Sequence, residues 1–268
     1  HQRIPYMIYN EHYNKVPSAE KVKELLEKDP SITHVAMVHS ETTSGILNDI
    51  ESVAKEVKGK GKTFIVDAMS SFGGVDIEVQ KLGIDFLVSS ANKCIQGVPG
   101  FSFVICRKDQ LEASEGKARS LSLDLYDQWK TMSVDGKWRF TSPTHVVLAF
   151  AKALEELKEE GGIPARAKRY EENNRLLIEK MKEFGIQPYI DAEHQGTIIT
   201  TFFYPDSHDF SFAEMYEFIK ERGYAIYPGK VTEADTFRIG NIGEIYREDI
   251  LRLVEIFREF FKLHGMEV

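Results

Sequence analysis

The first half of the chain alternates short apolar runs with an amphipathic helical pattern, and this alternation constrains the fold more than any other feature. Residues 34–39, 63–66 and 84–88 are apolar runs of the length typical of buried strands. A helical pattern over residues 50–57 separates the first two runs and ends at two glycines. Strands that alternate with helices and are joined by short loops predict a largely parallel α/β sheet.

The second half has longer helical patterns. Residues 146–160 and 165–184 each form a long helical stretch, and residues 246–264 form a final amphipathic helix. The change in pattern predicts two domains. We expect a large α/β domain over residues 1–150 and a smaller α/β domain over residues 151–268.

Composition limits the kinds of partner. The 268 residues carry a net charge of −8, which argues against a nucleic-acid partner. No apolar run approaches the length of a membrane span, so we expect no membrane partner. The two cysteines, Cys94 and Cys106, favour a reducing compartment without a disulfide framework. We therefore expect a cytoplasmic protein with small-molecule substrates.

A polar turn over residues 89–100 contains Lys93 and follows directly on the apolar run 84–88. A partly desolvated ammonium has a lowered pKa and deprotonates readily, which suits a lysine that forms a Schiff base. The alternative is an exposed lysine on a connecting loop, which is the more common case for a lysine taken alone.

Asp67 ends the apolar run that precedes the one leading to Lys93. In a parallel sheet both side chains would then lie at the same edge. A lysine that binds an aldehyde and an aspartate that pairs with a ring nitrogen suit pyridoxal phosphate. Asp67 could instead cap a helix or form a salt bridge, and the spacing alone does not decide between these roles.

Several ordered segments resemble those of one enzyme family. The chain is similar to the fold-type-I pyridoxal-phosphate aminotransferases of class V, and most similar to the 2-aminoethylphosphonate–pyruvate transaminases. The resemblance implies a homodimer with shared active sites that converts 2-aminoethylphosphonate and pyruvate to phosphonoacetaldehyde and alanine, in phosphonate degradation. The segments that carry it are residues 38–45, 66–73, 89–100, 119–124, 138–145, 227–230 and 238–243.

The resemblance also implies roles for the residues around the cofactor. Lys93 matches the lysine that holds the cofactor as a Schiff base, and Asp67 matches the partner of the pyridinium nitrogen. Thr43 matches a threonine near the ring hydroxyl, and Asn92 precedes the lysine as it does in the family. Thr43 and Asn92 could instead satisfy backbone groups of their turns.

Two further matches concern the cofactor phosphate and the substrate. Thr141 matches a threonine that reaches the cofactor phosphate of the other subunit, and could instead cap the helix that follows. Arg238 matches the arginine that binds the acidic group of the substrate, because a guanidinium suits carboxylate and phosphonate oxygens. Arg238 could also pair with a structural carboxylate.

One part of the family pattern has no match. The family opens with a Gly/Ser/Thr loop for the cofactor phosphate and an aromatic residue that stacks on the ring, and we expect this segment to precede His1. Either the sequence is a fragment, or the polypeptide is truncated and inactive.

Three alternatives for the function stay open: the phosphonate transaminase, an alanine– or serine–glyoxylate aminotransferase, and a non-catalytic remnant of the fold. We expect no metal, because His39 and Glu41 form an H-x-E pattern without a Cys-x-x-Cys pair.

Overall fold

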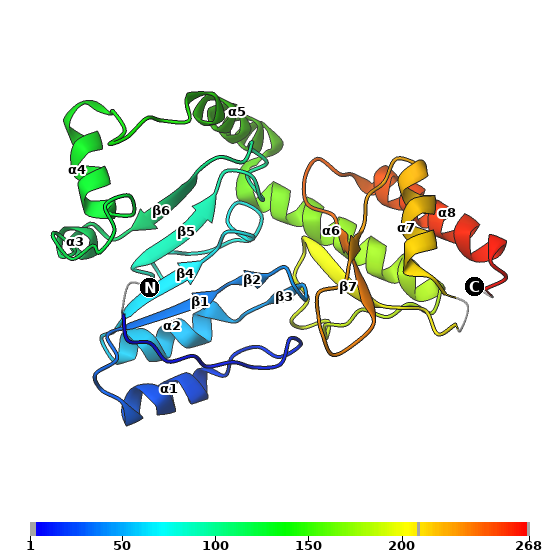
Figure 1. The fold of residues 1–268 in the computed structure, drawn as a ribbon, viewed down its shortest axis with the longest axis horizontal. Helices are drawn as coiled ribbons and strands as arrows, with labels where there is room; N and C mark the ends of the chain where they lie inside the picture. The colour runs from blue at the N-terminus through cyan, green and yellow to red at the C-terminus, as the bar shows by residue number, and fades with distance from the viewer. Residues whose placement is uncertain (1–3, 208–209, 267–268) are drawn as a thin grey trace.

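A computed structural model of the protein describes residues 4–207 and 210–266. These residues form a four-stranded sheet and a three-stranded sheet, each with its own helices, and a small two-stranded sheet, β2-β3 (Figure 1). The elements in chain order are α1 (Ala19–Lys28), β1 (His34–Val38), β2 (Ser40–Glu41), β3 (Ile46–Leu47), α2 (Ile50–Gly59), β4 (Thr63–Asp67), β5 (Phe86–Ser90), β6 (Ser102–Cys106), α3 (Lys108–Glu112), α4 (Leu125–Asp135), α5 (Thr144–Glu160), α6 (Gly162–Glu183), β7 (Ile199–Phe203), α7 (Phe212–Glu221), β8 (Tyr227–Pro228), β9 (Thr236–Gly240) and α8 (Arg247–Leu263).

The first sheet has the strand order β1-β4-β5-β6. Strands β1, β4 and β5 are parallel, and Val38, Asp67 and Val88 stand side by side at their carboxyl ends. Strand β6 returns antiparallel to β5. The loops that follow β1, β4 and β5 therefore meet at one edge of the sheet, as the alternation of strands and helices predicts.

Helices α1 and α2 cover one face of this sheet (Figure 1). Phe64 and Val66 of β4 and Leu87 of β5 point to this face and are fully buried against apolar residues of the two helices. The strand residues that point to the other face are more accessible, and Val38 is 36% exposed. The first sheet therefore has one closed face and one open face within the described residues.

The second sheet, β7-β9-β8, is antiparallel. Phe202 of β7 and Phe237 of β9 stack with ring centroids 5.7 Å apart, and neither is exposed. They share a core with residues of α6, α7 and α8, of which Phe257 and Phe260 of α8 are also fully buried. This core is the largest connected group of buried apolar residues in the part of the chain that the structure describes.

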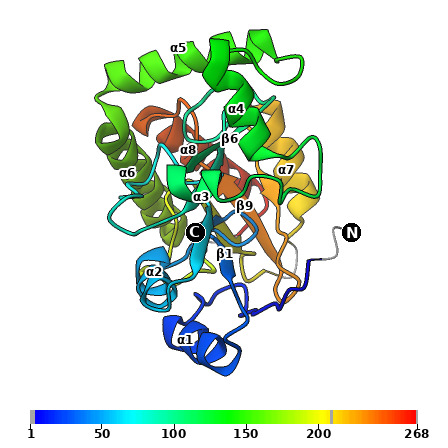
Figure 2. The same ribbon diagram turned by 90° about the vertical axis from the view of Figure 1, so that its left-hand side faces the viewer.

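Helices α5 and α6 lead from the first sheet to the second. Helix α6 begins beside the first sheet and extends beneath β7, while α5 and α1 lie at opposite ends of the molecule (Figures 1 and 2). The predicted boundary at residue 150 falls inside α5, and the division into two domains stays a prediction. Within residues 4–207 and 210–266, no helix combines the length and the apolar character needed to cross a membrane.

Candidate active site

Asp67 is the last residue of β4 and is half-buried. Its Oδ1 accepts a hydrogen bond from the backbone N–H of Met69 at 2.9 Å, which holds the carboxylate over the loop that follows. Its Oδ2 accepts no hydrogen bond from any residue that the structure describes. This oxygen is therefore available to a ligand at the carboxyl edge of the sheet.

The loop that contains Thr43 lies between the two sheets. Glu41 Oε1 accepts a hydrogen bond from the backbone N–H of Thr43 at 2.8 Å. Gly45 has a φ of +92°, and a Cβ atom there would lie 2.7 Å from the carbonyl oxygen of Ile199 on β7. Only glycine fits this close approach without strain. Gly45, the last residue of the segment 38–45, is thus needed where the loop contacts the second sheet.

Arg238 reaches this loop from β9. Its Nη1 donates to the carbonyl oxygen of Thr42 at 2.8 Å, and its Nε donates to that of Pro228 at 3.1 Å. The residue is 6% exposed, and burial lowers the pKa of its guanidinium, while Tyr227 and Glu41 oppose that shift. The structure therefore brings Arg238 beside the Thr43 loop, although the two are far apart in sequence.

Lys93 lies half-buried in the turn between β5 and β6. Two backbone hydrogen bonds close the turn, from Gln96 N–H to the Lys93 carbonyl and from Gly97 N–H to the Ala91 carbonyl, each 2.8 Å long. Gln96 has a φ of 64°, a conformation in which non-glycine residues are uncommon. The turn is therefore tightly defined around the lysine.

A cavity of about 570 Å³ lies between the open face of the first sheet and residues 9–17. Its lining includes Asp67, Glu41 and Ser44, but not Lys93, Thr141 or Arg238. The cavity thus reaches only part of the predicted site.

Two serines at this edge have hydroxyl groups that are buried without a partner. Ser44 lies in the turn between β2 and β3, and Ser90 ends β5 three residues before Lys93. A buried hydroxyl without a partner is costly, so such groups are suited to receive a ligand. Together with an amine and a free carboxylate oxygen, they fit the aldehyde and the ring of pyridoxal phosphate.

Two predicted site residues lie on the surface. Asn92 and Thr141 are exposed, and their predicted roles stay predictions. The cap of α5 is Pro143, so the alternative of Thr141 as a helix cap is wrong. In the described part of the chain, neither Asn92 nor Thr43 uses its side chain to hydrogen-bond its turn, which removes support from that alternative.

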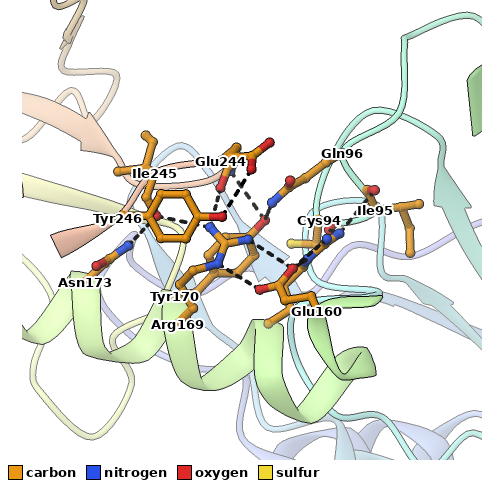
Figure 3. Close-up of polar contacts among 12 residues, drawn as sticks. Cys94, Ile95, Gln96, Glu160, Arg169, Tyr170, Asn173, Glu244, Ile245 and Tyr246 are labelled. Atoms are coloured by element: carbon orange, nitrogen blue, oxygen red, sulfur yellow. Dashed lines mark hydrogen bonds and ion pairs between the residues drawn. The ribbon is translucent and has the colours of Figure 1, made fainter. Parts of the chain in front are cut away.

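Sequence reasoning missed a polar network that connects the lysine turn to α6 and to the loop after β9 (Figure 3). Its members on α6 include Arg166, Arg169, Tyr170 and Asn173. Their spacing of three and four residues places them on one face of the helix, a signal that the sequence contains. Within the described residues, no group of three His, Cys, Asp or Glu side chains could hold a metal ion.

Comparison with known proteins identifies the family. The model of the family described as aminotransferase class-V matches residues 7–247, most of the chain. The chain belongs to the class-V aminotransferases. This membership implies pyridoxal phosphate as the cofactor, as the sequence predicts.

Two relatives of this class-V aminotransferase have the same name. The 2-aminoethylphosphonate–pyruvate transaminase of Lysinibacillus sphaericus is 56% identical over 265 residues, which cover 99% of this chain and 72% of the relative. That of Bacillus cytotoxicus is 57% identical over 240 residues, which cover 89% of this chain and 66% of the relative. The chain thus spans 66% to 72% of the length of these relatives.

A solved structure shows the same fold. The pyridoxamine–pyruvate aminotransferase of Mesorhizobium loti superimposes on the chain with a TM-score of 0.85 at 21% identity, covering 95% of this chain and 66% of that one. The predicted fold-type-I α/β architecture, with a mostly parallel sheet, is confirmed for this class-V aminotransferase.

Proposed function

We propose that this class-V aminotransferase transfers an amino group from 2-aminoethylphosphonate to pyruvate. The observation that carries the proposal is the hydrogen bond from Arg238 to the Thr42 carbonyl, because it brings a buried cation to the turn that follows β1, the strand whose last residue pairs with Asp67. The names of the relatives, at 56% and 57% identity, support the same reaction.

Each of three residues has a distinct task in this proposal. Lys93 would hold the cofactor through its Nζ, and its free amine would act as the base that takes the proton from the carbon that bears the substrate amino group. Asp67 uses its free Oδ2 to keep the ring nitrogen protonated. Pyridoxal phosphate supplies an aldehyde that condenses with amines and a ring that accepts electrons.

Arg238 binds the phosphonate of the substrate. Two of its nitrogen atoms donate to carbonyl groups, while Nη2 donates to no residue that the structure describes. Nη2 therefore makes the first contact with an oxyanion. A bidentate contact would also use Nη1, which would leave the Thr42 carbonyl.

We also infer a homodimer. Helix α4 buries none of its residues within this chain, and the neighbouring Leu121 and Leu123 are 73% and 77% exposed. Exposed apolar side chains grouped in this way are typical of an interface. Arg139, two residues before Thr141, donates from Nη1 to the carbonyl oxygen of Leu121 at 2.6 Å, and Thr141 would contact the cofactor phosphate of the other subunit. Sedimentation at twice the mass of one chain tests this inference.

The cytoplasmic location stays a prediction.

Replacement of Lys93 tests the reaction most directly. Lys93→Ala removes both the attachment point and the base, so we expect transamination to fall by about 10³-fold or more. The visible absorption of the lysine-bound cofactor should also disappear. Lys117→Ala, at an exposed lysine outside the site, serves as the control. Normal turnover by Lys93→Ala would contradict the assignment.

The alternatives are separated by two measurements. Turnover with 2-aminoethylphosphonate should exceed turnover with serine or alanine as the amino donor, whereas a glyoxylate aminotransferase would show the reverse order. Titration with pyridoxal phosphate should produce an absorption band of the bound cofactor. A non-catalytic remnant would produce no such band.

A further inference from the structure

Glu160, Arg166 and Arg169 form a partly buried ionic cluster at the junction of α5 and α6. Glu160 Oε2 lies 2.7 Å from Nη2 of Arg166, and Glu160 Oε1 lies 2.8 Å from Nε of Arg169. The two arginine side chains are only 3% and 13% exposed. Buried ion pairs are a weak source of stability, because desolvation offsets much of the attraction. The cluster therefore calls for an explanation in terms of what it holds.

Arg166 holds the lysine turn. Its Nη1 donates to the carbonyl oxygens of Cys94 at 2.9 Å and Ile95 at 3.2 Å, the two residues that follow Lys93. The next residue, Gln96, donates from Nε2 to the hydroxyl of Tyr170 at 2.6 Å. Three consecutive residues after the lysine are therefore fixed to side chains of α6 (Figure 3).

Arg169 holds the loop that follows β9, the strand that bears Arg238. Its Nη1 donates to the carbonyl oxygens of Gly243 at 2.7 Å and Ile245 at 3.1 Å. Asn173 also donates to the Ile245 carbonyl, at 2.7 Å. Figure 3 shows Arg169, Glu160 and the lysine turn on the same side of α6.

Glu160 joins the two arginines. Burial raises the pKa of its carboxyl, but hydrogen bonds from Arg169 and Arg166 outweigh this effect, and the net pKa lies below its usual range. The carboxylate is thus ionised at neutral pH and keeps both guanidinium planes in place. Tyr170 also connects the two arms of the network, which are the lysine turn and the loop after β9. Its hydroxyl accepts a hydrogen bond from Gln96 and, at 3.4 Å, one from the backbone N–H of Gly243.

We propose that Glu160, Arg166 and Arg169 are positioning residues that set Lys93 against Arg238. The inference rests on the proposed transamination, because it assigns the two ends of the cluster to the reacting amine and the substrate cation. A guanidinium holds two carbonyl groups at fixed angles, which a lysine ammonium cannot reproduce. A misplacement of about 1 Å at the reacting group is enough to slow catalysis by about 10²-fold.

The test separates the two arms by their kinetic effect in the holoenzyme. Arg166→Lys keeps the charge and loosens the lysine turn. We expect kcat to fall by about 10- to 100-fold, with a shifted pH profile of kcat and a KM for 2-aminoethylphosphonate that stays within about threefold. Arg169→Lys loosens the loop after β9 and should mainly raise KM. The control is Arg175→Lys, on the exposed face of the same helix, which should change neither constant.

A second measurement is independent of activity. Hydrogen exchange of the cofactor-free protein reports the backbone amides of Gln96 and Gly97 in the lysine turn and of Gly243 after β9. Arg166→Lys should accelerate exchange at Gln96 and Gly97, and Arg169→Lys at Gly243. Tyr170→Phe, which removes one hydroxyl and keeps the ring, should accelerate both sets, and it replaces Arg166→Lys if that variant does not fold.

The outcomes distinguish the two proposals. The positioning role is supported if each variant accelerates exchange only in its own arm, and if Arg166→Lys lowers kcat while Arg169→Lys raises KM. Equal effects of Arg166→Lys and Arg169→Lys on both constants, or exchange equal to that of the wild type, would overturn it. If the wild-type holoenzyme turns over a different amino donor, the proposed substrate is wrong, and the split measured with that donor still decides the positioning role.

Discussion

The two larger sheets of this protein differ in how completely they are covered. In the second sheet, β7 and β9 contribute to a core that α6, α7 and α8 complete, with Phe202 and Phe237 fully buried. In the first sheet, α1 and α2 cover one face, and the described residues leave Val38 and its neighbours on the other face accessible. Parallel sheets normally have both faces covered.

The difference indicates a division of tasks. The second sheet contributes to the larger apolar core, although Thr201 and Thr236 on its strands also have buried hydroxyl groups without a partner. The carboxyl edge of the first sheet brings the half-buried Asp67 together with the unpaired hydroxyls of Ser44 and Ser90. Such groups do not add stability unless they find partners. Stability should therefore depend more on the second region, and ligand binding more on the first.

The largest expected effect is on the core of the second sheet. Phe257→Ala should lower the free energy of unfolding by about 3–5 kcal/mol, because it empties a fully buried site. Val38→Ala on the open face of the first sheet should cost less than about 1 kcal/mol. Denaturant unfolding of both variants measures the difference. A cost for Val38→Ala as large as that for the buried Val66→Ala would mean that further polypeptide covers this face.

An intermediate effect concerns pH, and it should arise in the first region. His39 is 5% exposed, and burial lowers the pKa of its imidazole from 6.5 to about 4. The unfolded chain thus takes up this proton at higher pH than the folded chain. The contribution of His39 to the free energy of unfolding is complete above pH 6.5 and is lost as the pH falls toward 4. For a pKa shift of this size the loss is about 3 kcal/mol.

His39→Asn should remove this part of the pH dependence, measured as the free energy of unfolding from pH 7 to pH 4. The matched control is Ser71→Ala, which removes the hydroxyl that lies 2.9 Å from His39 Nδ1 and keeps the titrating group. An unchanged slope in His39→Asn would assign the acid sensitivity elsewhere. The buried polar side chains of the second region are Arg, Asn and Thr, which do not titrate in this range.

The smallest effect concerns thiol reactivity at the seam, which is the contact between the lysine turn of the first region and the second region. Burial raises the pKa of Cys94 to about 12, so only about one molecule in 10⁴ carries its thiolate at pH 8. Cys94 packs against Tyr170 and Ile198, whereas Cys106 on β6 is half-buried. A thiol reagent should modify Cys106 first and Cys94 only when the regions separate. Peptide mapping along a denaturant series checks this order, and early labelling of Cys94 would contradict a closed seam.

The sequence by itself determined the type of fold and the candidate residues. The period of the apolar residues is a local property, so the strands before Asp67 and Lys93 and their common edge could be predicted without a structure. The resemblance of ordered segments added the cofactor and the family, and the family is confirmed. The roles of Thr43, Asn92, Thr141 and Arg238 stay predictions.

Only the tertiary structure decided which distant residues meet. Arg238 contacts Thr42, Gly45 lies against Ile199, and Arg166 contacts Cys94, in each case between segments that are far apart in sequence. Such contacts depend on how the two sheets pack through α6, which no local pattern encodes. For the same reason the sequence could not show that one face of the first sheet is open. Nor could it show that a half-buried carboxylate, Glu160, connects the lysine turn to the loop that follows the strand of Arg238.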